Sequence, residues 1–384
     1  MDIARTAIAT AATALAAIML ASAPGCTGRG GTGGGIFTDT VYAPAHASGF
    51  VILGCDTMSS TLLRVTDPWQ GADGVVIDCF VRRDGEMPPP GFDGQVVEAG
   101  CGSVVCMSSS YVAMLDRIGE VRRVAGVSGL DYVTNPYVAA HRADIKDVGA
   151  EPDLETLAAL RPGVVLLYGI SSAQTALTDK MEEAGIPYVY MGEYVENSPL
   201  GKAEWLVAVA ELLDRRETGI AAFAPMPAAY DSLKALVADV QDRPKVMVNA
   251  PWGDTWYMPS TASYMVRLIE DAGGEYVYGG NDTNASSTIG METALTLLSR
   301  SDVWLDAGHV GSLDELAGTN PAYATVPPVK GRRVWNSDRR TNERGANDFW
   351  ESAVVMPDVV LRDLIGIMHP GTTDSEPYFY RHLE

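Results

Sequence analysis

Positive charge is scarce in this chain of 384 residues. Lysine and arginine together number 28, against 49 aspartates and glutamates, which gives a formal net charge of −21 at pH 7. A surface of this sign repels the phosphates of nucleic acids and the headgroups of anionic membranes. We therefore expect neither of them as a partner. Solubility is the simplest explanation of the acidity.

Histidine and cysteine are also few, which limits metal chemistry. The five histidines are scattered, and neither a His-x-x-x-His pair nor a Cys-x-x-Cys motif occurs. Because such spacings are typical of zinc sites, we expect no site for a bare metal ion. Cys55, Cys79, Cys101 and Cys106 permit three pairings. A bridge between Cys55 and Cys79, on two neighbouring strand-like runs, is one of them, and the pairing stays open.

Common catalytic signatures are missing as well. The sequence has no Gly-x-Ser-x-Gly elbow and no phosphate-binding glycine loop. We therefore assign no catalytic residue and expect a binding protein. An extracytoplasmic enzyme with its active site in a cleft is the alternative from another class, and a structural or adhesive surface protein is a third.

The only long apolar run lies at the N-terminus. Residues 6–23 are almost wholly Ala, Ile, Leu, Met and Thr, with Arg5 in front, which is typical of a signal peptide. The run ends in small residues before Cys26 and a glycine-rich stretch. We predict a signal peptide over 1–25, lipidation of Cys26 and a tether over 26–46. The protein would lie in the cell envelope, on the periplasmic side of a membrane, attached only by its lipid. A plain secretory signal is the alternative.

The most specific pattern is an internal repeat. The stretch 153–167 has a looser copy at 291–305, and each copy places a Glu-Thr pair at the start of a short helix before a buried-type strand. A repeat of this kind predicts two similar halves. We therefore expect a binding cleft between two lobes, with Glu155 and Glu292 at equivalent surface positions.

The order of strand-like and helix-like segments divides the chain into parts. Short strand-like runs come first, and alternation of strand and helix then predicts two doubly wound α/β lobes. Between them lies a helical connector that Pro225 and Pro227 must divide. In chain order the predicted parts are a β-rich extension (47–98), the first lobe (99–196), the connector (197–243), the second lobe (244–370) and a tail (371–384).

Three stretches carry a family resemblance: 104–128, 147–163 and 347–351. In order and spacing, the chain from 47 to 370 resembles periplasmic substrate-binding proteins of ABC importers for iron–siderophore, haem or cobalamin-type ligands, in a branch found in Bacteroidetes-type bacteria. The resemblance implies two α/β lobes bridged by a long helix. It also implies a monomer without a cofactor of its own, which delivers a metal chelate to a permease. A receptor for another small molecule is the alternative.

The resemblance also implies a role for the two equivalent glutamates. In the family, one glutamate on each lobe docks into arginine pockets of the permease, and Glu155 and Glu292 match these positions. A carboxylate suits such a pocket because it accepts paired hydrogen bonds from a guanidinium group. Each glutamate taken singly is also explained by the dipole of its helix.

Ligands of parallel α/β sheets bind outside the carboxyl ends of the strands. Tyrosine and tryptophan there would offer flat faces to a macrocycle, and arginines would clamp carboxylates. Core packing of the aromatic residues and a solvated arginine loop are the alternatives. The predicted ligand contacts are Ser109, Tyr111, Tyr132, Tyr168, Trp252, Trp256, Tyr257, Arg339 and Arg340. The same strand ends also carry Ser108, Ser110, Glu193 and Tyr194.

Overall fold

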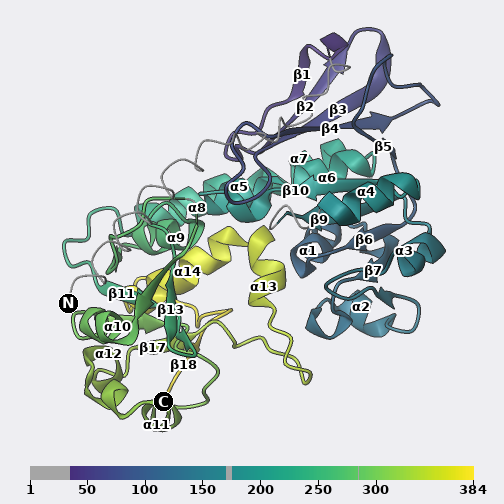
Figure 1. Cartoon of the computed structure of the whole chain (residues 1–384). Coiled ribbons are helices and arrows are strands. Elements are labelled where there is room, and N and C mark those ends of the chain that lie inside the picture. Colours follow the sequence, from purple (N-terminus) through teal and green to yellow (C-terminus); the bar gives the residue numbers. More distant parts are fainter. Residues whose placement is uncertain (1–34, 170–174, 284) are drawn as a thin grey trace, which may run out of the picture.

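The computed structural model describes residues 35–169, 175–283 and 285–384. The predicted signal peptide and the predicted lipidation site at Cys26 lie outside these residues. Two α/β lobes stand side by side, and a β-sheet rises from the first of them (Figure 1). None of the helices in the described ranges has the length and apolar character needed to cross a membrane.

The N-terminal extension is a five-stranded sheet with the order β1-β2-β3-β4-β5. Its first four strands pair antiparallel, and β5 runs parallel to β4. The sheet begins within the range predicted to be a tether, so that range is partly folded. The strands are β1 (Asp39–Tyr42), β2 (Phe50–Cys55), β3 (Met58–Thr66), β4 (Val76–Arg82) and β5 (Gln95–Glu98).

This sheet rules out the bridge between Cys55 and Cys79. The two residues lie on β2 and β4, and β3 runs between these strands. Neighbouring strands are about 4.8 Å apart. Two strand spacings alone therefore separate the two cysteines by at least about 10 Å, beyond the Cα–Cα limit of about 7 Å for a disulfide. Cys55, Cys79, Cys101 and Cys106 are all free thiols.

The first lobe contains a five-stranded parallel sheet with the order β10-β9-β6-β7-β8. The chain turns to opposite sides after β6 and β9, which creates a crevice at their carboxyl ends. The strands are β6 (Val104–Cys106), β7 (Val124–Val127), β8 (Lys146–Asp147), β9 (Val164–Tyr168) and β10 (Tyr188–Met191). The helices are α1 (Ser109–Arg117), α2 (Pro136–Ala140), α3 (Leu154–Leu160) and α4 (Thr175–Glu183), with 3-10 turns η2 (Val121–Arg123), η3 (Leu130–Tyr132) and η5 (Glu193–Val195).

The connector is helical, as predicted, and consists of α5 (Pro199–Glu204), α6 (Leu206–Leu212), α7 (Arg216–Phe223) and α8 (Pro225–Ala235). Pro225 occupies the first turn of α8, where a missing N–H costs least. A second break lies at Asp214, whose φ of 56° is incompatible with a continuous right-handed helix. α7 packs against α6, and α8 packs against α14 (Pro357–Met368) of the second lobe.

The second lobe contains a sheet with the order β14-β11-β16-β17-β18, in which only β18 runs antiparallel. Its strands are β11 (Lys245–Val248), β14 (Glu275–Tyr276), β16 (Val303–Leu305), β17 (Val334–Asn336) and β18 (Arg381–His382). A small antiparallel sheet adds β12 (Pro251–Trp252), β13 (Thr255–Met258) and β15 (Ser287–Gly290). The other helices are α9 (Tyr264–Asp271), α10 (Met291–Leu298), α11 (Leu313–Thr319), α12 (Pro327–Lys330) and α13 (Phe349–Ser352), with η6 (Pro321–Thr325) and η7 (Ala353–Val355).

The predicted tail is part of this lobe. β18 pairs with β17, and Phe379, Tyr380 and Leu383 are buried with no measurable exposure. The internal repeat also has the expected form, because α3 leads into β9 and α10 leads into β16. Glu155 and Glu292 lie in the first turns of these two helices, and both are exposed.

Candidate functional site

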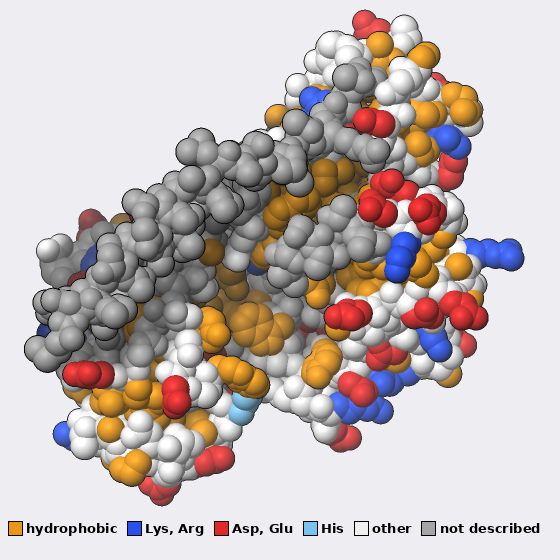
Figure 2. All heavy atoms as spheres, viewed as in Figure 1, with side chains coloured by type: hydrophobic (Ala, Val, Ile, Leu, Met, Phe, Trp, Pro, Cys, Tyr) orange, Lys and Arg blue, Asp and Glu red, His pale blue; other side chains and the backbone are white. Residues whose placement is uncertain are grey.

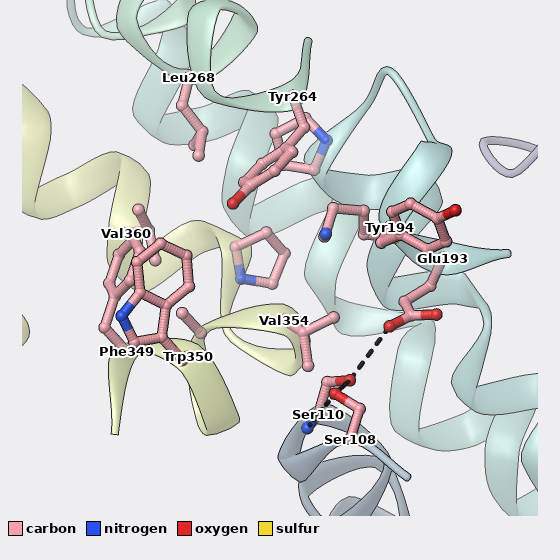
Figure 3. Close-up of a pocket in the computed structure, with 14 residues that line it drawn as sticks. Ser108, Ser110, Glu193, Tyr194, Tyr264, Leu268, Phe349, Trp350, Val354 and Val360 are labelled. Carbon is pink, nitrogen blue, oxygen red and sulfur yellow. Dashed lines mark hydrogen bonds between the residues drawn. The ribbon is translucent and has the colours of Figure 1, made fainter. Parts of the chain in front are cut away.

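A cavity of about 340 Å³ lies between the two lobes. The first lobe, the connector and the second lobe each contribute part of its wall, and hydrophobic side chains gather in this hollow (Figure 2). Glu193 and Ser110 lie on one side, and Phe349 and Trp350 lie on the other (Figure 3). The cavity therefore has the position expected for a ligand site between lobes.

The wall from the first lobe is polar and hydrogen-bonded. Ser108 caps α1, and its hydroxyl accepts a hydrogen bond from the amide of Ser110. The hydroxyl of Ser110 donates to Glu193 Oε1 at 3.1 Å, and the hydroxyl of Tyr111 donates to Glu193 Oε2 at 3.3 Å. Burial raises the pKa of Glu193, although Lys202 and the two hydroxyls oppose this shift. This wall thus holds a carboxyl group in a fixed orientation.

The connector adds a lysine to the cavity. Lys202 comes from α5, and its Nζ lies 4.1 Å from the ring centroid of Tyr264. Burial lowers the pKa of Lys202, whereas the carboxylates of Glu193 and Glu196 favour its charged form. A cation over an aromatic ring gains a favourable electrostatic interaction, and low surrounding polarity strengthens it. The same environment would strengthen contact with an anionic group of a ligand.

The wall from the second lobe is aromatic and aliphatic. Tyr264 and Leu268 come from α9, and Phe349 and Trp350 come from α13. The rings of Phe349 and Trp350 meet edge to face, with centroids 5.3 Å apart. Trp350 is 62% exposed, so its indole forms part of the rim. Such rigid flat surfaces suit a large apolar or planar ligand.

α13 belongs to the second half of the chain but packs against α1 of the first lobe (Figure 1). The amide of Thr134 donates to Glu351 Oε2 at 2.6 Å, and the hydroxyl of Thr134 donates to Asp348 Oδ1 at 3.0 Å. Glu351 is only 2% exposed, and burial raises its pKa from 4.5 to about 7. A buried carboxyl group therefore helps to hold the segment that carries the aromatic wall.

A second cavity, of about 550 Å³, lies on the other face of α13 and contains the predicted arginine pair. Arg340 forms a salt bridge of 2.8 Å with Asp348, and its guanidinium lies 4.2 Å from the ring centroid of Tyr378. Arg339 forms a salt bridge of 2.6 Å with Glu376. Both arginines are already paired with carboxylates and face this cavity, away from the aromatic one.

Two predicted ligand contacts are buried in the core. Trp256 has no exposed surface, and its indole N–H donates to the carbonyl of Val248 at 2.9 Å. Tyr111 also has no exposed surface, and it reaches the cavity only through its bond to Glu193. In this structure, both side chains are therefore packing residues. Tyr111 affects the cavity indirectly, because its hydroxyl helps to orient Glu193.

The other predicted contacts lie near the cavity or away from it. Ser109 donates to the carbonyl of Trp350 at 3.4 Å, beside the aromatic wall. Tyr168 ends β9 and is partly buried. Trp252, Tyr257 and Tyr132 are 80%, 47% and 73% exposed, and they line neither of the two cavities described above. Among the other residues at strand ends, the structure brings together Ser108, Ser110, Glu193 and Tyr194.

Sequence reasoning missed Lys202, Tyr264, Phe349 and Trp350. Lys202 and Tyr264 lie on helices, where a rule based on strand ends does not apply. Phe349 and Trp350 lie within the stretch 347–351 that carries the family resemblance, and this adjacent aromatic pair was the available signal. In the described part of the chain, no group of three or more His, Cys, Asp or Glu side chains is arranged to hold a metal ion.

Comparison with known proteins supplies the family. A family model described as periplasmic binding protein matches residues 104–341. An uncharacterized lipoprotein of Methanocaldococcus jannaschii is 26% identical over 313 residues, which cover 76% of this chain and 72% of the relative. The matched family region begins after β5, so the N-terminal sheet lies outside it.

Solved structures share the fold at low sequence identity. A periplasmic heme binding protein from Pseudomonas aeruginosa aligns with a TM-score of 0.58 at 14% identity, covering 74% of this chain and 98% of that protein. The molybdate periplasmic binding protein MolA from Haemophilus influenzae aligns with a TM-score of 0.56 at 14% identity, covering 72% and 88%. These likenesses concern the fold alone, because one fold serves many ligands.

Proposed function

Because the chain belongs to the periplasmic binding protein family, we propose that it is the extracytoplasmic receptor of an ABC importer for a metal chelate. The chelate is of the iron–siderophore, haem or cobalamin type. It binds between the two lobes and is delivered to the permease. The observation that carries this proposal is the interlobe cavity with Tyr264, Phe349 and Trp350 in its wall. Aromatic faces of this kind supply binding energy to large apolar ligands.

The partly buried lysine adds a second requirement on the ligand. Lys202 lies in a wall of low polarity, where a single ionic contact is stronger than at an exposed surface. Carboxylates or other anionic groups at the edge of a chelate would pair with it, while the aromatic side chains cover the apolar part. We propose no catalytic role for these residues and no cofactor other than the bound ligand.

Delivery would depend on the two exposed glutamates. Glu155 and Glu292 occupy equivalent first turns in the two lobes, which supports their proposed role as docking residues for arginine pockets of the permease. Lipidation of Cys26 would keep the monomeric receptor at the membrane.

Calorimetric titration of the full chain in detergent tests the ligand class. The panel contains haem, cyanocobalamin, a ferric catecholate and a ferric hydroxamate siderophore, with molybdate and ferric ion for comparison. We expect saturable one-site binding of one chelate. Lys202→Met should weaken an anionic chelate about tenfold, because a bond to a charged group is lost. Lys180→Met, an exposed lysine on α4, is the matched control.

The outcome that contradicts the proposal is a folded protein that binds none of the chelates. Binding only of molybdate would instead favour the second candidate, a receptor for another small anionic molecule. One observation supports that candidate, since about 340 Å³ lies at the small end of the usual range of ligand pockets.

A further inference from the structure

The loop between β3 and β4, residues 67–75, has a defined shape. The amide of Asp67 donates to the carbonyl of Val75 at 2.9 Å, and the amide of Val75 donates to Asp67 Oδ1 at 2.9 Å. Within the loop, the amide of Ala72 donates to the carbonyl of Trp69 at 3.0 Å. The loop belongs to the N-terminal sheet, which lies outside the region that the family model matches.

This loop lies across the carboxyl ends of two strands of the first lobe. The indole of Trp69 packs edge to face on Tyr190 of β10, with centroids 5.3 Å apart. It also covers Gly169, directly after β9, where an added Cβ would lie 2.6 Å from Trp69 Cε3. Strand ends of this kind are where parallel α/β sheets bind ligands. The loop therefore occupies part of the ligand-binding edge.

The loop also contacts a residue of the interlobe cavity. The amide of Gln70 donates to the hydroxyl oxygen of Tyr194 at 3.2 Å, and that hydroxyl donates to the carbonyl of Gly169. An adjoining cavity of about 200 Å³ is lined by Gln70 together with Tyr194, Tyr264 and Trp350. The last three also line the aromatic cavity, so Gln70 lies beside the same ligand space.

Buried carboxylates fix the extension to the connector. Glu204 is 1% exposed and accepts hydrogen bonds from three consecutive backbone amides, those of residues 45–47, at 2.7 to 2.9 Å. Glu196 accepts from the amides of Ser48 and Gly49 and from the indole N–H of Trp205. These bonds fix residues 45–49 of the extension, while the contacts of Trp69 and Gln70 fix the loop itself. A wall that is held before a ligand arrives lowers the entropic cost of binding.

We propose that loop 67–75 is a fixed wall of the ligand cleft and determines which chelate fits. Gln70 lines the adjoining cavity, where its polar side chain contacts the edge of the ligand. Trp69 is a positioning residue, because it holds the loop on β9 and β10. The inference rests on the proposed function, since it concerns the ligand of the same cleft.

The test repeats the calorimetric panel of haem, cyanocobalamin, the two ferric siderophores and molybdate with variants of the full chain. Gln70→Ala should weaken the bound probe about five- to tenfold, because one hydrogen bond is lost. Trp69→Ala should change which chelates of the panel bind, and Trp69→Phe should largely restore the selectivity of the wild type. Met87→Ala, on an exposed loop of the same extension, should bind as the wild type does.

The possible outcomes separate the two proposals. A wild-type protein that binds no probe overturns the proposed function, and this inference with it. If Gln70→Ala and Trp69→Ala both bind the same chelate as the wild type with the same affinity, only the role of the loop is overturned. Gln70 is exposed, so Gln70→Ala keeps the test valid even where loss of Trp69 disturbs folding.

Discussion

Replacing Glu351 by glutamine should remove a pH dependence of stability that we expect of the wild-type protein between pH 4.5 and about 7. The carboxyl group is 2% exposed and accepts the amide of Thr134. Burial, the largest cause, raises its pKa from 4.5 to about 7 in the folded protein. The folded state therefore binds this proton more tightly than the unfolded chain does.

The magnitude follows from the two pKa values. The gap between 4.5 and about 7, at about 1.4 kcal/mol for each pH unit, amounts to about 3 kcal/mol. This contribution is fully present below pH 4.5 and is lost as the pH rises through about 7. Glutamine does not ionise, and its amide oxygen still accepts the bond from Thr134. The free energy of unfolding of the variant, relative to that of the wild type, should therefore increase with pH by up to about 3 kcal/mol.

Urea unfolding followed by circular dichroism measures the effect. The free energies of unfolding of wild type and Glu351→Gln are compared at about pH 5 and pH 8, below and above the raised pKa. Glu376→Gln is the control, because the side chain of Glu376 is 83% exposed. If the difference between Glu351→Gln and wild type is equal at both pH values, or if the variant loses stability at pH 8, the reasoning is wrong.

Three further predictions concern the core, the extension and docking. Trp256→Ala should lower the free energy of unfolding by about 3–5 kcal/mol in urea titration, because a fully buried ring leaves a cavity, and a change below 1 kcal/mol would contradict this. Glu204→Leu should cost about 3 kcal/mol or more in the same assay, since the amides of residues 45–47 lose their acceptor, and unchanged stability would refute that role. Glu155→Lys combined with Glu292→Lys should abolish uptake by cells without changing ligand affinity in calorimetry, and normal uptake would exclude docking.

The regular alternation of strand and helix made most of the fold predictable. The runs at Val104–Cys106 and Val164–Tyr168 are apolar throughout, as strands buried on both faces must be. Strands without such a run were missed. β18 consists of Arg381 and His382, and it forms because its backbone pairs with β17 at the edge of the sheet. β1 is largely exposed and likewise depends on pairing with its neighbour.

Sequence patterns predicted only those residues of the candidate site that come directly after a strand. Ser110 and Glu193 follow β6 and β10, and they meet at the cavity. The aromatic residues of 252–257 show the limit of this reasoning, because successive side chains of a strand point to opposite faces. Pairing with β15 turns Trp256 into the core and leaves Tyr257 half-exposed. The position of Lys202 over Tyr264 depends on how the connector meets α9, which no local pattern specifies.

Quenching of Trp350 fluorescence tests the central claim, that a chelate binds between the lobes, most directly. Trp350 is 62% exposed at the rim of the aromatic cavity, so a ligand there would contact its indole. The full chain and Trp350→Phe are titrated with haem, cyanocobalamin and the two ferric siderophores. The account predicts saturable quenching by one chelate, with a clearly smaller amplitude in Trp350→Phe. Quenching of equal amplitude in both proteins, or none in a folded sample, would contradict it.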